Sequence, residues 1–211
     1  MNRNLFIEQL ELGGMANFSY IIGDKASGDA AVIDPHDDTN TLESAAEQNN
    51  LTIKTVLLTH GHFDHVGGVR HFADKRGCPV YLSKDEFMLF VPGCKTLKRL
   101  NNNDEIPIGD FLIKCLSTPG HSPGGISFLV EGNLFTGDTL FIDAIGRADL
   151  PGGNSSVLFK SLQKIKQLPE DTIIWPGHNY GRTTYGQLKT LKTENPFLAC
   201  ETEEEFQGLT G

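Results

Sequence analysis

Residues 56–65 read Val56-Leu57-Leu58-Thr59-His60-Gly61-His62-Phe63-Asp64-His65. The first three residues are apolar and begin with a β-branched valine, which is typical of a buried strand. The chain then turns at Gly61 and carries three histidines and an aspartate away from the strand end. Imidazole and carboxylate groups are ligands that suit Zn, Fe and Mn. The stretch therefore predicts a metal-binding loop after a strand, and the competing interpretation is a surface loop that is merely rich in histidine.

The spacing within this loop favours two neighbouring ions. His60 and His62 are two residues apart, so in an extended or turning backbone both rings can converge on one ion. Asp64 and His65 lie further along the loop and more naturally serve a second ion.

The composition restricts the class of protein. With 211 residues, of which 38% are hydrophobic, the chain is long enough for one sizeable core or at most two small ones. No apolar run approaches the ~20 residues that a membrane span needs, and the N-terminus lacks the apolar core of a secretory signal. The four cysteines form no C-x-x-C pair, so we expect reduced thiols and a cytoplasmic location. A net charge of −9 argues against general affinity for nucleic acid.

The rest of the chain reads as strands interleaved with helices, without a linker or a clear repeat. Strands are expected at 5–12, 18–23, 30–33, 53–58, 79–82, 111–116, 126–130, 134–136 and 172–175, the last being the final strand. Helices are expected at 41–50 (capped by Thr39 or Asn40), 66–75, from about Lys84, at 155–168 (opened by Ser155) and at 183–194 (ended by Pro196). Residues 92–105 are expected to be irregular.

Four short apolar strands are each followed by a small-residue turn and a side chain that can bind a metal. The four sites are Thr59-His60, Pro119-Gly120-His121, Gly137-Asp138 and Pro176-Gly177-His178. In layered α/β proteins, loops at the carboxyl ends of strands converge and bind ligands. Each case alone could be a turn residue that bonds to backbone. Together with the loop above they supply five histidines and two aspartates, which is enough for two metal sites.

This set of motifs closely resembles the metallo-β-lactamase superfamily. The stretch Phe135-Thr136-Gly137-Asp138-Thr139-Leu140-Phe141 and the Gly146-Arg147 turn are similar to the glyoxalase II (hydroxyacylglutathione hydrolase) branch, in its compact single-domain form. The resemblance covers nearly the whole chain. It implies an α/β fold, the four-layer αββα sandwich with two mixed sheets face to face and helices outside. We expect one domain over residues 1–211 and no C-terminal helical substrate domain, because the chain stops soon after His178.

The resemblance also implies a dinuclear centre. The first ion would take His60, His62 and His121, the second would take Asp64, His65 and His178, and Asp138 would bridge both. Two divalent ions are expected, with Zn ahead of Fe or Mn. Asp64 is the predicted catalytic residue, because it would help to orient a hydroxide held between the ions. Asp34 matches an aspartate that steadies the histidine loop from outside the ligand set, although a plain turn aspartate is the alternative.

Substrate contacts are implied for two further residues. Arg147 and Tyr180 fall where glyoxalase II has a basic residue and a tyrosine that bind substrate. Asp149 replaces a neighbouring aromatic contact, so the resemblance supports metal binding more strongly than glutathione binding. His36 and His71 match no ligand position, and we expect them to be structural or exposed.

The predicted function is a metal-dependent hydrolase that cleaves a small-molecule thioester such as S-lactoylglutathione through a metal-bound hydroxide. One alternative with the same fold is a mononuclear Fe(II) persulfide dioxygenase, which would use His60, His121 and Asp138. A non-catalytic metal-binding module is the alternative from another class. A nuclease is disfavoured by the acidic charge, and neither nucleic acid nor a membrane is expected as a partner. The sequence does not determine the oligomeric state.

Overall fold

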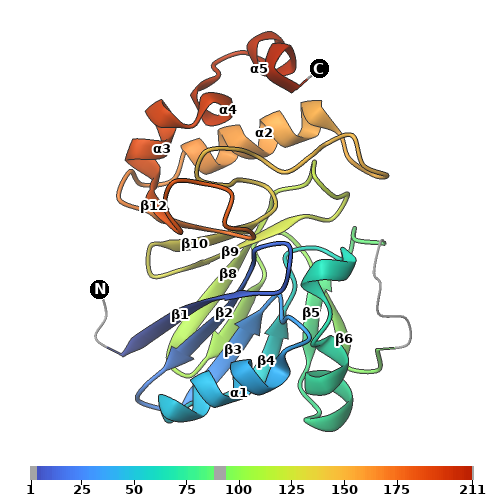
Figure 1. Ribbon diagram of the computed structural model, residues 1–211, viewed down its shortest axis with the longest axis vertical. Coiled ribbons are helices and arrows are strands. Elements are labelled where there is room, and N and C mark those ends of the chain that lie inside the picture. Colours follow the sequence, from blue (N-terminus) through green and yellow to red (C-terminus); the bar gives the residue numbers. More distant parts are fainter. Residues whose placement is uncertain (1–3, 88–93, 211) are drawn as a thin grey trace.

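Two six-stranded sheets lie face to face in the computed structural model, which describes residues 4–87 and 94–210 (Figure 1). The first sheet is mixed: β1 to β3 are antiparallel, and β3 to β6 run parallel to one another. Its strands, in spatial order, are β1 (Leu5–Leu12), β2 (Asn17–Asp24), β3 (Asp29–Ile33), β4 (Thr52–Leu57), β5 (Val80–Ser83) and β6 (Leu97–Leu100).

The second sheet is also mixed, because β10 and β11 pair in parallel while its other neighbours pair antiparallel. Its strands, in spatial order, are β12 (Gly186–Gln187), β11 (Ile173–Pro176), β10 (Asn133–Gly137), β9 (Ile126–Val130), β8 (Phe111–Ser117) and β7 (Glu105–Ile108).

Helices cover the outer face of each sheet. On the first sheet lie α1 (Thr39–Gln48) and a short π-helical turn at His71–Lys75. On the second lie α2 (Ser155–Lys166), α3 (Leu188–Glu194), α4 (Pro196–Ala199) and α5 (Glu203–Thr210), which form the top layer in Figure 1. This is the four-layer αββα sandwich that the sequence predicted. Within the described residues, no helix combines the length and apolarity needed to cross a bilayer.

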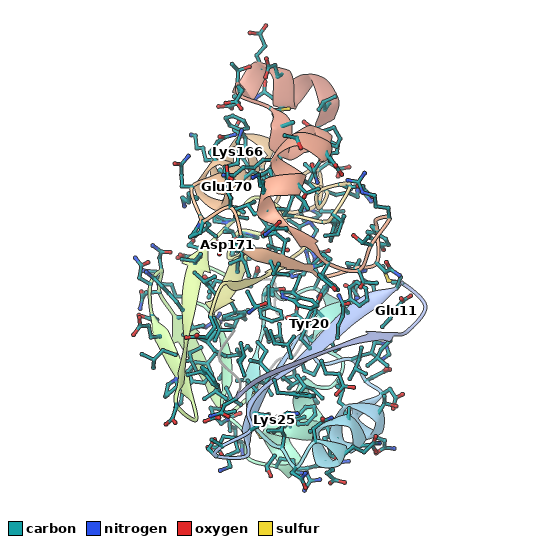
Figure 2. All side chains as sticks on the ribbon, turned by 90° about the vertical axis from the view of Figure 1, so that its left-hand side faces the viewer. Glu11, Tyr20, Lys25, Lys166, Glu170 and Asp171 are labelled. Atoms are coloured by element: carbon teal, nitrogen blue, oxygen red, sulfur yellow. The ribbon has the colours of Figure 1, made fainter. Side chains whose placement is uncertain are left out.

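The main core fills the space between the two sheets. Side chains of β2, among them Phe18 and Ile22, pack against Phe128 and Phe135 from the second sheet. Tyr20, which lies near the middle of the molecule in Figure 2, donates a hydrogen bond from its buried hydroxyl to the Pro176 carbonyl oxygen at 2.5 Å. Because Pro176 ends β11, this bond fixes the end of one sheet against the other, next to His178.

Most predicted strands are present, and the differences have local causes. Residues 92–105 were wrongly expected to be irregular: Leu97–Leu100 forms β6, an edge strand whose exposed Lys98 and Arg99 hide the apolar pattern. The strand at 172–175 is not the final one, because the two-residue β12 follows it. The expected helix at 66–75 begins three residues late: residues 69–70 are α-helical and His71–Lys75 is π-helical, whereas 66–68 are not helical. Residues 84–85 form a turn and 86–87 have no regular structure, so the described part of the expected helix from Lys84 is absent; its continuation lies outside the described residues.

Helix starts also differ from the sequence prediction. The cap of α1 is Asp38, whose carboxylate accepts from the Thr41 amide at 3.2 Å. The cap of α2 is Asn154, one residue before the predicted start. In the tail, only 188–194 of the expected 183–194 is helical, and Pro196 opens the further helix α4.

The four cysteines are free thiols.

Candidate metal centre

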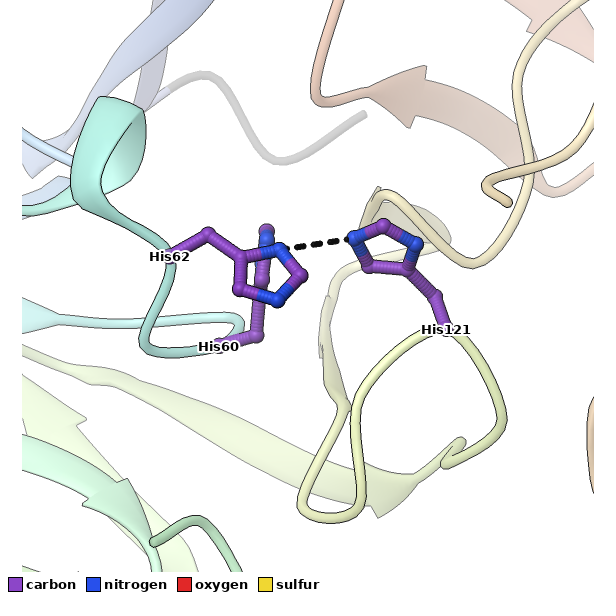
Figure 3. Close-up of side chains that lie close together, drawn as sticks. All are labelled: His60, His62 and His121. Carbon is purple, nitrogen blue, oxygen red and sulfur yellow. Dashed lines mark hydrogen bonds between the residues drawn. The ribbon is translucent and has the colours of Figure 1, made fainter. Parts of the chain in front are cut away.

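The seven residues predicted as metal ligands meet at one edge of the sandwich, where strand ends from both sheets converge. The loop after β4 supplies four of them, and the loops after β8, β10 and β11 supply one each. The rings of His60 and His62 face His121 across the gap between two loops (Figure 3). The ligand atoms of these three histidines lie within 4.8 Å of one another, and His62 Nδ1 is 3.0 Å from His121 Nε2.

A second cluster lies beside the first. The ligand atoms of Asp64, His65 and His178 also lie within 4.8 Å of one another. His65 Nε2 is 3.2 Å from His178 Nε2, and both rings approach the same Asp64 oxygen, Oδ2, at 3.4 and 3.5 Å. A loop and a strand end more than a hundred residues apart in sequence thus form one group.

Asp138 lies between the two clusters. Its Oδ1 is 3.4 Å from His65 Nε2, while its Oδ2 is 3.5 Å from His121 Nε2 and 3.3 Å from His178 Nε2. The buried Oδ1 atom has no hydrogen-bond partner in the structure. A buried carboxylate oxygen without a partner is costly, so this atom is suited to receive a cation.

Hydrogen bonds on the far side of the rings determine which nitrogen faces the cluster. The Thr59 hydroxyl is 2.6 Å from Asp34 Oδ2 and 3.0 Å from His60 Nδ1. A hydroxyl has one proton, which we assign to the carboxylate bond, so His60 Nδ1–H donates to Thr59 and the Nε2 lone pair points inward. His60 Nε2 is buried and has no hydrogen-bond partner.

The same arrangement recurs at three other histidines. His121 Nδ1 donates to the Arg147 carbonyl at 2.7 Å, and His178 Nδ1 donates to the Met15 carbonyl at 2.9 Å. His65 Nδ1 donates to Asp34 Oδ2 at 3.1 Å. Each of these bonds leaves the Nε2 lone pair of a neutral imidazole directed into the cluster, which is the arrangement that metal-ligating histidines adopt.

Asp34 holds the histidine loop at two points. Besides bonding His65 and the Thr59 hydroxyl, it accepts the Thr59 backbone N–H at 2.8 Å, and its own backbone is left-handed with φ 47°. The side chain is almost fully buried. Its position is thus that of a group which orients the loop rather than of an isolated turn residue.

Three residues near the site have roles that the sequence analysis did not assign. Asn17 is buried, and its amide donates to Asp64 Oδ2 at 3.0 Å and to the Asp64 carbonyl at 3.2 Å. Gly146 and Gly177 allow close packing: an added Cβ would lie 1.9 Å from the Asp138 carbonyl oxygen and 2.3 Å from Asp138 Oδ1, respectively. Gly146 and Gly177 stand in motifs that the sequence analysis named. Asn17 is 47 residues from Asp64, and no sequence pattern links the two.

The pKa values of the cluster residues show that, without a metal ion, protons on some of the histidines would balance the carboxylate charges. Burial and the neighbouring histidines lower the pKa of His60 and His62. Burial opposes the charge on His65 too, but the Asp138 charge and the Asp34 hydrogen bond prevail and raise its pKa to about 9. Burial opposes the charges on His178 and Asp138, but contact with Asp138 raises the pKa of His178, and the His65 charge followed by the His178 hydrogen bond lowers the pKa of Asp138. Metal ions would displace such protons.

A cavity of about 570 Å³ opens directly over the cluster. His62, Asp64, His121, Asp138 and His178 face it, and its remaining lining is Met15, Phe63, Phe141, Ala144, Ile145, Gly146, Arg147, Leu150, Pro151 and Tyr180. The cavity thus places the two clusters within reach of a bound small molecule.

The two predicted substrate contacts both line this cavity. The Tyr180 ring stacks on His178 with centroids 4.7 Å apart, and its hydroxyl donates to the Met15 carbonyl at 3.1 Å. The Arg147 guanidinium forms two hydrogen bonds to Asp149, at 2.9 and 2.8 Å. The remaining histidines lie outside the clusters: His36 contacts Asp37 at 2.8 Å, and His71 contacts Glu43.

Known proteins share the fold and about 30% of the aligned sequence. The family model described as "Metallo-beta-lactamase superfamily" matches residues 12–178. The "probable polyketide biosynthesis zinc-dependent hydrolase PksB" of Bacillus subtilis is 32% identical over 194 residues, which is 92% of this chain and 86% of PksB. The crystal structure of ETHE1 from Myxococcus xanthus superposes with a TM-score of 0.88 at 30% identity, covering 97% of this chain and 89% of that one. That of TTHA1623 in a di-iron-bound form gives 0.76 at 29% identity, covering 90% and 99%.

Proposed function

The chain belongs to the metallo-beta-lactamase superfamily, and from this membership we propose that it is a metal-dependent hydrolase of small-molecule thioesters. The observation that carries the proposal is the convergence of four Nε2 lone pairs and the unpartnered Asp138 Oδ1 on one buried space beneath an open cavity. The similarity to PksB, a protein named as a zinc-dependent hydrolase, supports a hydrolytic role.

We assign the ligands to two ions. His60, His62 and His121 would hold one, Asp64, His65 and His178 would hold the other, and Asp138 would bridge them. The distances above support this division, because each set of three is mutually close and Asp138 contacts members of both. Nitrogen and carboxylate donors suit Zn first and also Fe or Mn. The similarity to a di-iron-bound structure is consistent with two ions.

The chemistry divides between the ions and the chain. When bound, two divalent ions supply Lewis acidity that acidifies water and polarises a carbonyl. The chain contributes orientation: Asn17 holds the Asp64 carboxylate by its Oδ2 atom at the bottom of the cavity. A carboxylate fixed there can hold an attacking water by hydrogen bonding and accept its proton. Tyr180 stacks on the His178 ring and so keeps solvent from one side of the cluster.

The substrate would lie in the cavity with its scissile carbonyl over the clusters. Arg147 and Tyr180 both line that cavity, which supports their assignment as substrate contacts. The glyoxalase II resemblance makes S-lactoylglutathione the first thioester to test.

The persulfide dioxygenase remains the alternative to be tested. It would need one Fe(II) on His60, His121 and Asp138 and would leave the second complete ligand set without a role. This second set is the reason that hydrolysis is the better-supported function.

The experiment begins with protein purified without added metal, whose metal content is measured. Samples reconstituted with Zn or with Fe(II) are then assayed for thioester cleavage in the absence of oxygen, and for oxygen consumption with glutathione persulfide. We expect anaerobic cleavage of thioesters by the Zn-loaded sample, since hydrolysis needs no electrons. Oxygen consumption that depends strictly on iron, without anaerobic cleavage, would establish the dioxygenase instead. Tight metal binding without turnover of either kind would point to a non-catalytic module.

A further inference from the structure

We propose that the cavity beside the metal clusters binds a neutral, apolar acyl group, so that the substrates are thioesters of uncharged alkyl or aryl acids. This inference rests on the proposed thioester hydrolysis and narrows it to a substrate class. It is carried by the side chains that form the cavity above the clusters and by the pairing of the one cation among them.

Six large side chains form an apolar wall around the cavity. They come from the β1–β2 turn, the histidine loop, the segment 141–151 and the loop after β11; they are Met15, Phe63, Phe141, Ile145, Leu150 and Tyr180. Three of the seven large apolar side chains that are exposed in the described part of the chain belong to this wall: Met15 at 45%, Phe63 at 62% and Tyr180 at 45%. Exposed apolar side chains gathered around one concave site are typical of a surface that binds an apolar group.

Charge in the cavity does not favour an anionic substrate. Among the described residues that line it, Arg147 is the one lysine or arginine, and both oxygens of Asp149 accept its hydrogen bonds. A substrate carboxylate would therefore compete with Asp149 for the guanidinium and would remain close to the Asp149 charge. Glutathione carries two carboxylates that need such partners, whereas an alkyl or aryl group needs none.

The size of the cavity sets the expected selectivity. Its volume of about 570 Å³ lies within the range of cavities that bind drug-sized molecules, so a medium-length acyl chain fits. Burying one methylene group is worth about 0.8 kcal/mol, which corresponds to roughly a fourfold gain per added methylene until the wall is covered.

The first experiment uses Zn-loaded protein and thioesters of N-acetylcysteamine, a neutral leaving group. The acyl groups are acetyl, butyryl, hexanoyl and adipoyl; the last two have the same number of carbon atoms but differ by a terminal carboxylate. We expect kcat/KM to rise about 16-fold from acetyl to butyryl and again towards hexanoyl. Adipoyl should be at least tenfold poorer than hexanoyl. A flat response to chain length, or a preference for S-lactoylglutathione over the hexanoyl ester, would overturn the inference.

Two kinds of variant test the residues behind this selectivity. Leu150→Ser should remove most of the gain from acetyl to hexanoyl, while Leu112→Ser, at an exposed leucine outside the cavity, should not. Asp149→Ala frees the Arg147 guanidinium, so it should raise kcat/KM for adipoyl and for S-lactoylglutathione more than for hexanoyl. Asp149 is exposed, so this substitution tests charge without risk to the core. An equal change for all substrates would count against the role of the pair.

Binding without turnover separates this inference from the proposed function. The probe is S-hexyl-N-acetylcysteamine, a thioether that cannot be hydrolysed, measured by titration calorimetry against its S-ethyl analogue. Tighter binding of the hexyl compound, without cleavage of any thioester, would refute the hydrolase but support the apolar cavity. Cleavage of thioesters with equal binding of both thioethers would support the hydrolase and refute the cavity assignment.

Discussion

The metal clusters and the apolar wall above them are held in place in opposite ways. Every histidine of the clusters except His62 has its outer nitrogen bonded to a fixed oxygen, and most of the cluster residues are buried. The wall consists of apolar side chains on loops and one 3-10 turn, and all of them except the buried Phe141 are at least partly exposed. We therefore expect the clusters to determine whether the reaction occurs and the wall to determine which substrate reacts. A substitution in the clusters should abolish activity, and one in the wall should change the substrate preference.

The largest effect is expected for Asp138→Ala. Asp138 contacts both clusters, so its loss would leave two cations near each other with no shared carboxylate between them. We expect loss of metal from both sets and a larger fall in kcat than for His178→Ala, beyond the 10–100-fold typical of groups outside the ligand shell. Metal content by mass spectrometry and kcat for the two variants provide the check. Retention of both ions and most of the rate by Asp138→Ala would place the bridge elsewhere.

Without metal, the free energy of unfolding should depend on pH through the histidines of the clusters. In the metal-free protein the raised pKa values of His65, about 9, and His178 mean that the folded state holds protons which the unfolded state releases above about pH 6.5. Their contribution to stability is complete below pH 6.5 and is lost as the pH rises to 9, a loss on the order of a few kcal/mol. Denaturant unfolding at several pH values measures it. The Zn-loaded protein should lack this decline, because the ions replace the protons.

A smaller effect is expected for Asp34→Asn, which keeps the size of the side chain but removes its charge. Asp34 accepts hydrogen bonds from Thr59 and His65, so the variant should mis-set the His65 ring and weaken Zn affinity about 10–100-fold. A competition assay with a chelator measures this affinity. Asp24→Asn is the matched control, since Asp24 is buried and accepts the amides of Ala26 and Asp110 away from the clusters. Equal Zn affinity for the two variants would contradict the role of Asp34.

Asn195 offers a way to disturb the wall and leave the clusters intact. Its buried amide donates to the carbonyls of Phe141, Ile142 and Ala144, and its oxygen accepts two amides at the start of α4. Asn195→Ala should cost about 1–3 kcal/mol of stability, because it leaves buried carbonyls unpaired. It should also raise KM for a hexanoyl thioester, with normal metal content.

The control for Asn195 is Asn154→Ala, which removes the α2 cap and no contact to the 141–144 segment. It should cost about 1 kcal/mol and leave KM unchanged. A rise in KM in both variants would show that loss of stability alone alters the cavity.

The smallest effect is expected for Arg147→Ala. Its pair with Asp149 is exposed at both ends, and such pairs contribute about 0–1 kcal/mol. Thermal unfolding should therefore shift little, and metal content should not change. If the wall binds neutral groups, KM for the hexanoyl ester should also change by less than about threefold. A large rise in KM for S-lactoylglutathione, with little change for the hexanoyl ester, would instead identify Arg147 as an anion-binding residue.

The sequence by itself predicted the candidate metal ligands, which the structure brings together, and the layered fold. Both depend on short-range patterns: apolar strands, small-residue turns after them, and ligand side chains at the turns, as in Gly137-Asp138 and Pro176-Gly177-His178. A side chain in the turn after a strand is placed at the edge of the sheet by local sequence alone. A local pattern therefore suffices to predict which side chains are candidate ligands. Edge strand β6 was missed because, at a sheet edge, side chains such as Lys98 and Arg99 face solvent and obscure the alternation.

Only the tertiary structure decided how those ligands are oriented and what surrounds them. The ring of His178 is set by the Met15 carbonyl, 163 residues away, and Asp64 is set by Asn17; backbone carbonyls and distant amides leave no mark in a local pattern. The hydrogen bonds between Arg147 and Asp149, by contrast, join residues only two positions apart. Tertiary contacts fix which lone pair points inward and which charges stay unpaired, because both depend on atoms brought together by folding.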